Sequence, residues 1–254
     1  MRKRPVVLFL MVGLLVLSMG TAAMAFNMGI GGTLGYVNLR MGDVRGWLEL
    51  YSEWYNSHSF ISSTLGNFKS AIPYGVDTKF SVTQNFKLAL GYTRLSGSQN
   101  LQVTNNRPGI EEQNENIQTS SHVVTGSLIL GMPVGPLFLY TGGGIGYYLS
   151  DFTWVNKIVE TSTTIEEGKG SAIGFHGLLG AEYFLGNNFS ISIEGLYRIA
   201  NISSAECTVS ENGWDEVGDP ITRPVDFSGS EESKNLELDF GGISIFGGIH
   251  IYIG

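Results

Sequence analysis

The chain contains, at residues 171–200, the stretch SAIGFHGLLGAEYFLGNNFSISIEGLYRIA, in which two runs of alternating apolar and polar side chains follow each other. The residues Gly186-Asn187-Asn188 separate the runs and supply the positive-φ conformations that a tight hairpin needs. A period of two residues is typical of a strand that lies between two different environments. The stretch therefore predicts a β-hairpin with one apolar face and one polar face.

The composition of the two faces indicates which medium the apolar face contacts. The apolar face carries Phe and Tyr near the strand ends, whereas Gly, Ser and charged residues occupy central positions of the other face. A soluble β-sandwich also alternates, with its polar face in water. Small and charged side chains at strand centres suit the lumen of a membrane barrel whose apolar face lies in lipid. We therefore predict a transmembrane β-barrel.

The first 25 residues have the pattern of a cleavable secretory signal peptide. A basic segment, Arg2-Lys3-Arg4, precedes an apolar run from Val6 to Leu17 and the small-residue site Ala23-Met24-Ala25. A membrane anchor is the alternative, but it needs about 18 or more apolar residues. We expect export from the cytoplasm and one outer-membrane β-barrel domain over residues 26–254.

Composition and charge narrow the class of protein. Glycine accounts for 35 of 254 residues, about double the usual ~7%, which fits strands that curve tightly or pack closely. The expected signal carries three of the 15 basic residues, so 12 remain against 23 acidic ones, a net charge of about −11. This balance excludes a basic nucleic-acid footprint. The single Cys207 cannot form an internal disulfide.

Alternation and turn signals predict eight antiparallel strands. The connections after the second, fourth and sixth strands have about three or four residues, and the others have roughly fifteen or more. This alternation is typical of outer-membrane barrels, which have short periplasmic turns and long external loops. In the last strand we expect a β-bulge at Gly241-Gly242 that keeps Leu236, Leu238 and Phe240 on the outward face of the later isoleucines. The expected strands are 28–39, 74–82, 86–96, 121–132, 136–152, 171–185, 189–200 and 236–253.

The segment 41–72 has two possible readings. Apolar side chains at helical spacing, with Asp43 as N-cap, predict a short amphipathic helix in the first external loop. Alternation around residues 46–55 also permits a strand, which with a partner would give ten strands. The helix is favoured, as a lid over the barrel mouth or as an interfacial segment, with an aromatic-rich boundary loop as the plainer alternative. The interfacial aromatic residues would be Trp47, Tyr51, Trp54 and Tyr55.

With these features the chain resembles the small eight-stranded outer-membrane β-barrels, the group around the OmpA transmembrane domain and OmpX. The resemblance is carried by the glycine row of Leu137–Leu149, by the run 193–198 and by Gly248, Ile251 and Ile253 of the last strand. It implies an eight-stranded up-and-down barrel in the outer membrane, with membrane lipid and the insertion machinery as partners. Such barrels usually end in an aromatic residue, whereas this chain ends Ile-Tyr-Ile-Gly.

In this register several polar side chains point into the lumen, where charges must be paired and hydrogen-bonded. We expect them to form a structural network that fills a narrow barrel, with Glu182 or Glu194 paired to Arg198. An ion-conducting lumen is the alternative. The residues of the predicted network are Asp77, Lys79, Lys87, His176, Glu182, Glu194 and Arg198.

A catalytic role has weaker sequence support. A lipid-modifying barrel, such as a lipid A deacylase or acyltransferase, would need a nucleophile, a histidine base and an orienting acid at one rim. The four histidines, His58, His122, His176 and His250, lack a serine two residues later, although His58 has serine on both sides. The acidic run 211–219 lacks the spacing of a calcium loop. We expect no catalytic residue, no metal site and no cofactor.

The sequence thus predicts an outer-membrane barrel with a structural role or with a role in interaction through its loops. The segments 41–72 and 203–234 would form the external surface and bind any extracellular ligand. The alternatives are a lipid-modifying enzyme and a narrow porin-like channel.

Overall fold

The computed structural model describes residues 27–57, 61–67, 69–70, 72–105, 113–158, 162–202, 206–211, 214–217, 222–224, 233–235 and 237–253. The expected signal peptide lies outside these residues. The elements in chain order are β1 (Asn27–Leu39), α2 (Gly42–Asn56), β2 (Ile61–Leu65), β3 (Lys69–Ser70), β4 (Tyr74–Ser81), β5 (Phe86–Asn105), β6 (Gln113–Val134), β7 (Leu137–Ile158), β8 (Ser162–Phe184), β9 (Phe189–Ile199), β10 (Asn201–Ile202), β11 (Glu206–Glu211), β12 (Trp214–Val217), β13 (Thr222–Pro224), β14 (Ser233–Asn235), β15 (Leu238–Asp239) and β16 (Gly242–Ile253).

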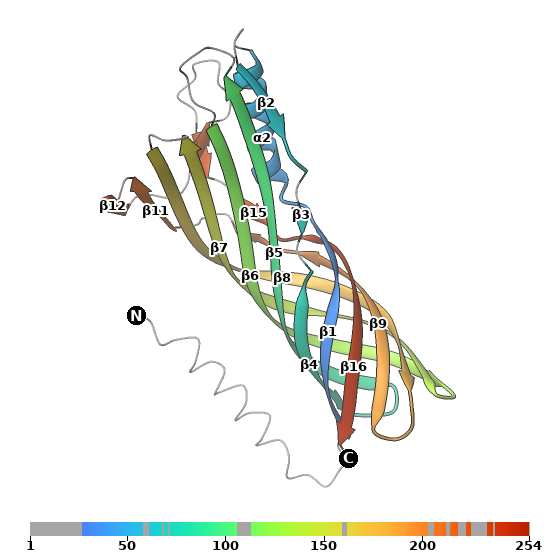
Figure 1. The fold of residues 1–254 in the computed structure, drawn as a ribbon. Helices are drawn as coiled ribbons and strands as arrows, with labels where there is room; N and C mark the ends of the chain where they lie inside the picture. The colour runs from blue at the N-terminus through green and yellow to red at the C-terminus, as the bar shows by residue number, and fades with distance from the viewer. Residues whose placement is uncertain are drawn as a thin grey trace.

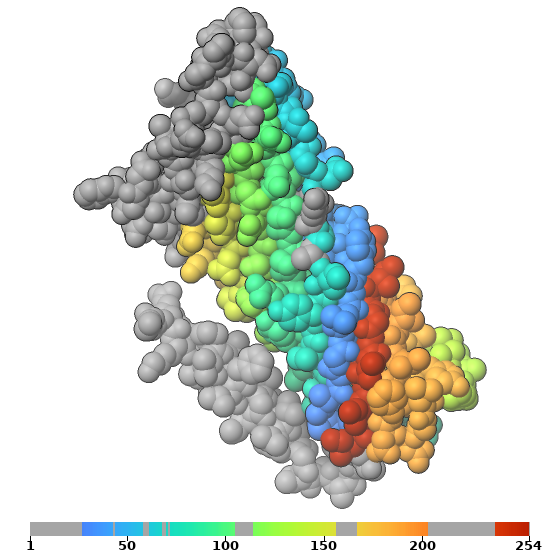
Figure 2. Space-filling model, viewed as in Figure 1, coloured from blue at the N-terminus to red at the C-terminus, as the bar shows by residue number. Residues whose placement is uncertain are grey.

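A ring of eight antiparallel strands forms the body of the protein, in the order β1, β4, β5, β6, β7, β8, β9 and β16. The ring closes where β16 pairs with both β1 and β9, for example Ile30 with Ile251 and Ile249 with Ile191. Figure 2 shows β1, β16 and β9 side by side on one continuous surface. The predicted eight-stranded barrel is confirmed. The described helix is too short and too polar to cross a bilayer.

The two ends of the barrel differ. Short turns join β4 to β5, β6 to β7 and β8 to β9 at the end where β16 finishes, and α2 lies at the opposite end (Figure 1). Two long polar connections expected from the sequence are largely strand, because β5 and β6 pair as far as Val103 with Gln113, and β7 and β8 as far as Ile158 with Ser162. The expectation of long loops after the predicted strands 86–96 and 136–152 is therefore wrong for the described residues, and the wall of β5 to β8 continues past the rest of the ring.

The side chains of this wall reverse their polarity along its length. On β5 the outward residues change from apolar ones such as Leu88 and Leu90 to polar ones from Arg94 onward. The inward residues change in the opposite sense, from Lys87 to the buried Leu95, Leu101 and Val103. A strand that leaves lipid for water must reverse in this way, because its outer face meets water and its inner face must then form a core.

The apolar side chains of the ring point outward, as predicted. Ile173 is 68% exposed, Ile193 59% and Ile253 60%, although all three lie at strand positions. Their neighbours in the chain point inward and are buried or half-buried. Such a continuous band of exposed aliphatic side chains is stable only against hydrocarbon.

The last strand differs from the prediction. Leu238 is 1% exposed and Phe240 is 0% exposed, so both point into the core, whereas Ile243 is 60% exposed. The strand is interrupted between Phe240 and Ile243. Before the interruption β15 pairs with β10, and after it Gly242 begins β16 with a φ of 134°, a conformation that favours glycine. The expected bulge with a single outward face is therefore wrong, because the residues before Gly241 cover the lumen.

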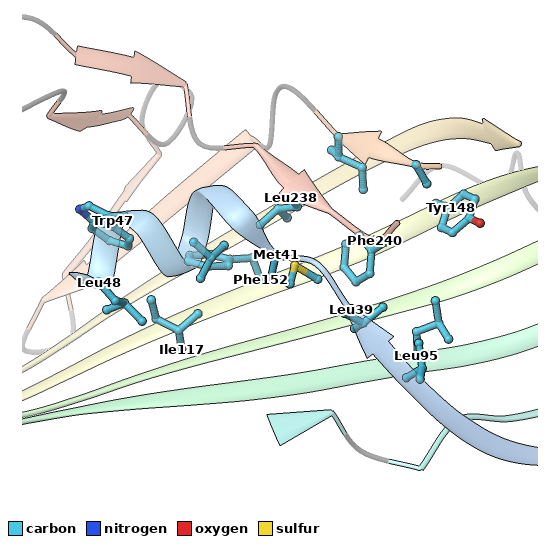
Figure 3. Packing of buried hydrophobic residues seen from close by; sticks show 14 of the residues in the cluster. Leu39, Met41, Trp47, Leu48, Leu95, Ile117, Tyr148, Phe152, Leu238 and Phe240 are labelled. Atoms are coloured by element: carbon cyan, nitrogen blue, oxygen red, sulfur yellow. The ribbon is translucent and has the colours of Figure 1, made fainter. Parts of the chain in front are cut away.

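The helix α2 packs against the inner side of the extended wall. Val44, Trp47 and Leu48 are buried in one cluster with Ile117 and Phe152 of the wall, and Figure 3 shows this cluster beside the helix. The predicted helix is confirmed, but it begins at Gly42 with Met41 at the N-cap, so Asp43 lies in its first turn. The apolar cluster formed here, called the upper core, also includes Leu39, Met41, Leu95, Leu101, Val103, Tyr148, Leu238 and Phe240.

Glycines let large inward rings pack against the barrel wall. A Cβ atom on Gly180 would lie 2.5 Å from the ring of Tyr140, and one on Gly29 would lie 2.6 Å from the ring of Tyr252. Since real Cβ contacts are longer than this, only glycine fits beneath these rings. Part of the high glycine content therefore makes room for aromatic side chains in a narrow lumen.

Candidate functional site

Glu182 is the centre of a buried network at the short-turn end of the lumen. Its carboxylate accepts hydrogen bonds from Ser190 (2.6 Å), Tyr252 (2.7 Å) and Lys87 (3.1 Å). Lys79 Nζ lies 3.9 Å from the same carboxylate. Glu182 is 0% exposed, so this charge depends on its partners rather than on water.

Aromatic rings surround the lysines of this network. Lys87 Nζ lies 4.3 Å from the ring centroid of Phe138, and Lys79 Nζ lies 5.4 Å from that of Tyr140. Both distances permit cation–π attraction. Rings, lysines and Glu182 together fill the short-turn end of the lumen.

Two further acidic side chains have their own partners. The carboxylate of Asp77 lies 3.0 Å from His250 Nε2, and Tyr140 donates a hydrogen bond of 3.1 Å to Glu194. These groups lie one layer above Glu182, toward the end of the barrel that carries α2. A chamber of about 80 Å³ adjoins them, lined on its far side by Tyr148, Arg198 and other residues.

Arg198 has different surroundings from those predicted. It is 3% exposed, and its Nη2 donates to Ser244 Oγ, whereas no described carboxylate lies within ion-pair distance. The expected pair of Glu182 or Glu194 with Arg198 is therefore wrong. The lysines from β4 and β5 reach Glu182 instead, and Tyr140 from β7 reaches Glu194.

The structure places all seven predicted network residues in the lumen. Asp77, Lys79, Lys87, Glu182 and Glu194 lie in the layers around Glu182, whereas His176 and Arg198 lie on the opposite side of the chamber. Sequence reasoning missed His250 and Tyr252, which complete the network. Their signal was the inward row between the isoleucines of the last strand: Ser244, Phe246, Gly248, His250 and Tyr252.

The upper core closes the other end of the lumen. Tyr148 and Phe246 border the chamber, and above them Leu39, Met41 and Phe240 pack inside the ring (Figure 3). Within the described residues, the lumen thus consists of a polar layer, a chamber and an apolar layer.

A buried carboxylate lies in the upper core, where the sequence analysis placed a loop. Glu115 on β6 is 1% exposed, and it accepts a hydrogen bond of 3.3 Å from Tyr55 of α2. Burial raises the pKa of Glu115 to about 7, although the hydrogen bond from Tyr55 and the nearby indole of Trp154 favour the charged form. Its position on the inner face of an extended strand could not be read from its polar neighbours.

The predicted aromatic segment has a mainly internal role. Trp47 packs edge-on against Trp154 with ring centroids 4.4 Å apart, and Tyr51 contacts the same ring. Trp47 and Tyr55 are buried in protein, so the expected interfacial position is wrong for them; Trp54 is 38% exposed. The helix packs on the inner side of the wall, and its role as a lid stays a prediction.

The remaining candidate groups give no catalytic arrangement among the described residues. His122 points outward and bonds to Tyr92 through Nδ1 at 2.6 Å, while His176 and His250 lie in the lumen. His58 and the side chains of Cys207 and the acidic run 211–219 lie outside the described residues. Within the described part, no cluster of His, Cys, Asp and Glu has the geometry of a metal site.

Comparison with known proteins agrees with this architecture. The family of the outer membrane protein beta-barrel domain matches residues 8–219. The chain belongs to this family. The short-turn end of this outer-membrane barrel is accordingly periplasmic, and the end that carries α2 is external.

Solved structures of other proteins are similar to this outer-membrane barrel at low identity. Neisserial surface protein A is 12% identical, with 91% of this chain and 98% of that chain covered and a TM-score of 0.40. CarO of Acinetobacter baumannii is 13% identical, with coverage of 74% and 96% and a TM-score of 0.39. The outer membrane protease OmpT of Escherichia coli is 10% identical, with coverage of 92% and 97% and a TM-score of 0.41. A search of curated proteins finds no match.

Proposed function

We propose that this outer-membrane barrel is a non-conducting membrane anchor that holds a rigid external wall for interaction and is not an enzyme. The observation that carries the proposal is the filling of the lumen at two levels. Glu182 and its partners occupy the periplasmic level, and the upper core with α2 occupies the external level. An ion would have to displace paired charges and then an apolar layer, and both steps are unfavourable.

Conductance tests this proposal directly. We expect no discrete openings when the refolded full chain is placed in planar bilayers, because the described residues around Glu182 and those of the upper core both occupy the lumen. A known porin inserted under the same conditions provides the positive control. Stable, discrete openings of this chain would overturn the proposal and favour a narrow channel, and a change in lipid A mass upon expression would favour the enzyme alternative.

On β5 and β6 the external wall presents uncharged hydrogen-bonding side chains, whereas its outward residues on β7 and β8 include the exposed Asp151, Glu167 and Lys169. On β5 and β6, Ser96, Ser98, Asn100 and Gln102 lie directly opposite Ser120, Gln118, Asn116 and Asn114. Amides and hydroxyls without net charge suit a partner rich in hydroxyl groups more than a charged protein surface. Since this ladder lies just above the lipid-facing band, the oligosaccharides of outer-leaflet lipid are the partner of matching chemistry.

We expect lipopolysaccharide with a complete core oligosaccharide to raise the thermal midpoint of the detergent-solubilised barrel more than a form truncated to lipid A. Replacing Asn100 and Gln118 by alanine should remove that difference, because both side chains supply exposed donors and acceptors. Glu49→Ala on the exposed face of α2 serves as the control. Equal shifts with the complete and truncated forms would contradict this role of the wall.

The segment 41–72 contributes less surface than expected. Its aromatic face is buried in the upper core, so the outer face of α2, with Arg45 and Glu49, remains available. An extracellular ligand bound through 41–72 and 203–234 stays part of the proposal. The side chains of 203–234 lie outside the described residues.

A further inference from the structure

We propose that the chamber inside the barrel is a binding site for a small monovalent inorganic anion, of the size of chloride, bromide or nitrate, held by Arg198 and His176. The chamber has a volume of about 80 Å³, enough for an ion of this size but not for a sugar or nucleotide. Both residues line it. They lie directly opposite each other on the neighbouring strands β8 and β9.

The other charged groups around the chamber already have partners. Asp77 is paired with His250 at 3.0 Å, and Glu194 accepts the hydroxyl of Tyr140 at 3.1 Å. Lys79 also lines the chamber, and its Nζ lies 3.9 Å from the carboxylate of Glu182, which does not line it. None of these groups needs a further ion.

Arg198 is the exception. It is 3% exposed, its Nε has no hydrogen-bond acceptor among the described residues, and the Nη2 bond goes to the neutral Ser244. Glu194, the acid on the same strand, is four residues away, about 13 Å at a rise of ~3.3 Å per residue. A buried guanidinium without a counter-ion is strongly unfavourable, so an anion in the chamber would stabilise the folded barrel.

His176 adds a second donor on the same side. Its Nε2 lies 2.7 Å from Ser127 Oγ, and its Nδ1 is buried without a partner. When the serine hydroxyl donates to Nε2, the neutral ring carries its proton on Nδ1. In this tautomer, Arg198 Nε and His176 Nδ1 are two buried donors at one chamber, and neither has an acceptor among the described residues.

The first experiment locates the ion. The full chain is refolded in bromide, so that the ion is enclosed as the barrel forms, and the crystals are measured at the bromine absorption edge. We expect an anomalous peak within hydrogen-bond distance of Arg198. A map without such a peak would overturn the proposal.

The second experiment separates binding from general salt effects. At constant ionic strength, replacing gluconate by nitrate or bromide should raise the thermal midpoint of the wild-type barrel in a saturable way, by several degrees. Arg198→Met should abolish the saturable rise, and Arg198→Lys should weaken it. Arg94→Met removes an exposed arginine that points outward and does not line the chamber, and it should keep the full rise. A wild-type barrel without a saturable rise, or an equal rise in Arg198→Met, would show that the chamber binds no anion.

Discussion

Replacing Glu182 by glutamine should destabilise the barrel by about 3–5 kcal/mol, the usual effect of removing one partner of a buried ion pair. Lys87, 3.1 Å from the carboxylate, and Lys79, at 3.9 Å, would then share a buried lumen without their common acid. The measurement is the free energy of unfolding in urea at neutral pH, followed by tryptophan fluorescence of the protein in lipid vesicles.

Glu49→Gln is the matched control for this loss. Glu49 pairs with Arg45 at 2.9 Å, but both side chains are at least half exposed, so an effect of ~0.5 kcal/mol or less is expected. Adding Lys87→Met to Glu182→Gln should recover part of the lost stability. The second substitution removes the lysine charge that the loss of the Glu182 carboxylate leaves unpaired. Equal small effects of Glu182→Gln and Glu49→Gln would mean that water, not protein, compensates the lumen charges.

The stability of the upper core should fall as pH rises from about 4.5 to about 7, the usual and the folded pKa of Glu115. Because the folded pKa is raised, the folded state holds its proton longer than the unfolded state does. The contribution of protonated Glu115 to folding stability is fully present below its unfolded pKa and is lost as the pH rises through its folded pKa. The loss at pH 8 corresponds to roughly 3 kcal/mol.

Helix α2 reports this change, since Tyr55 bonds to Glu115 and Trp47 packs on Trp154. We expect near-ultraviolet circular dichroism and protease resistance of α2 to be greater at pH 5 than at pH 8. Glu115→Gln should remove the pH dependence, whereas Asp151→Asn, at an exposed position of β7, should preserve it. A pH profile unchanged by Glu115→Gln would assign the effect to other groups.

The barrel body could be predicted because lipid imposes a simple rule on its sequence: apolar side chains point outward and polar ones point into the lumen. Apolar rows such as Ile173 and Ile193 can only point outward when Glu182 and Glu194 occupy the alternate positions. This rule predicted the number of strands, the face of each strand that contacts lipid, and the charged residues that point into the lumen. Pairing within the lumen was not predictable, because the partners of Arg198 and Glu182 depend on which strands face each other across it.

The external wall was missed because the rule reverses there. Leu101, Val103 and Ile117 alternate with Asn and Gln, which looks like a polar loop when outward residues are assumed to be apolar. Glu115 was hidden in the same run. The break before Gly242 was misread for a related reason: Leu238 and Phe240 are apolar in both readings, and only the upper core shows that they point inward.

The reversal of polarity on β5 to β8 also determines how deeply the protein sits in its membrane. If it sank by two residues, Arg94 and the amide ladder above it would enter the acyl chains; if it rose, the leucines and isoleucines below would meet water. A thinner or thicker bilayer must therefore adapt to this protein, by changing its local thickness around β5 to β8, rather than the protein shifting along the membrane normal.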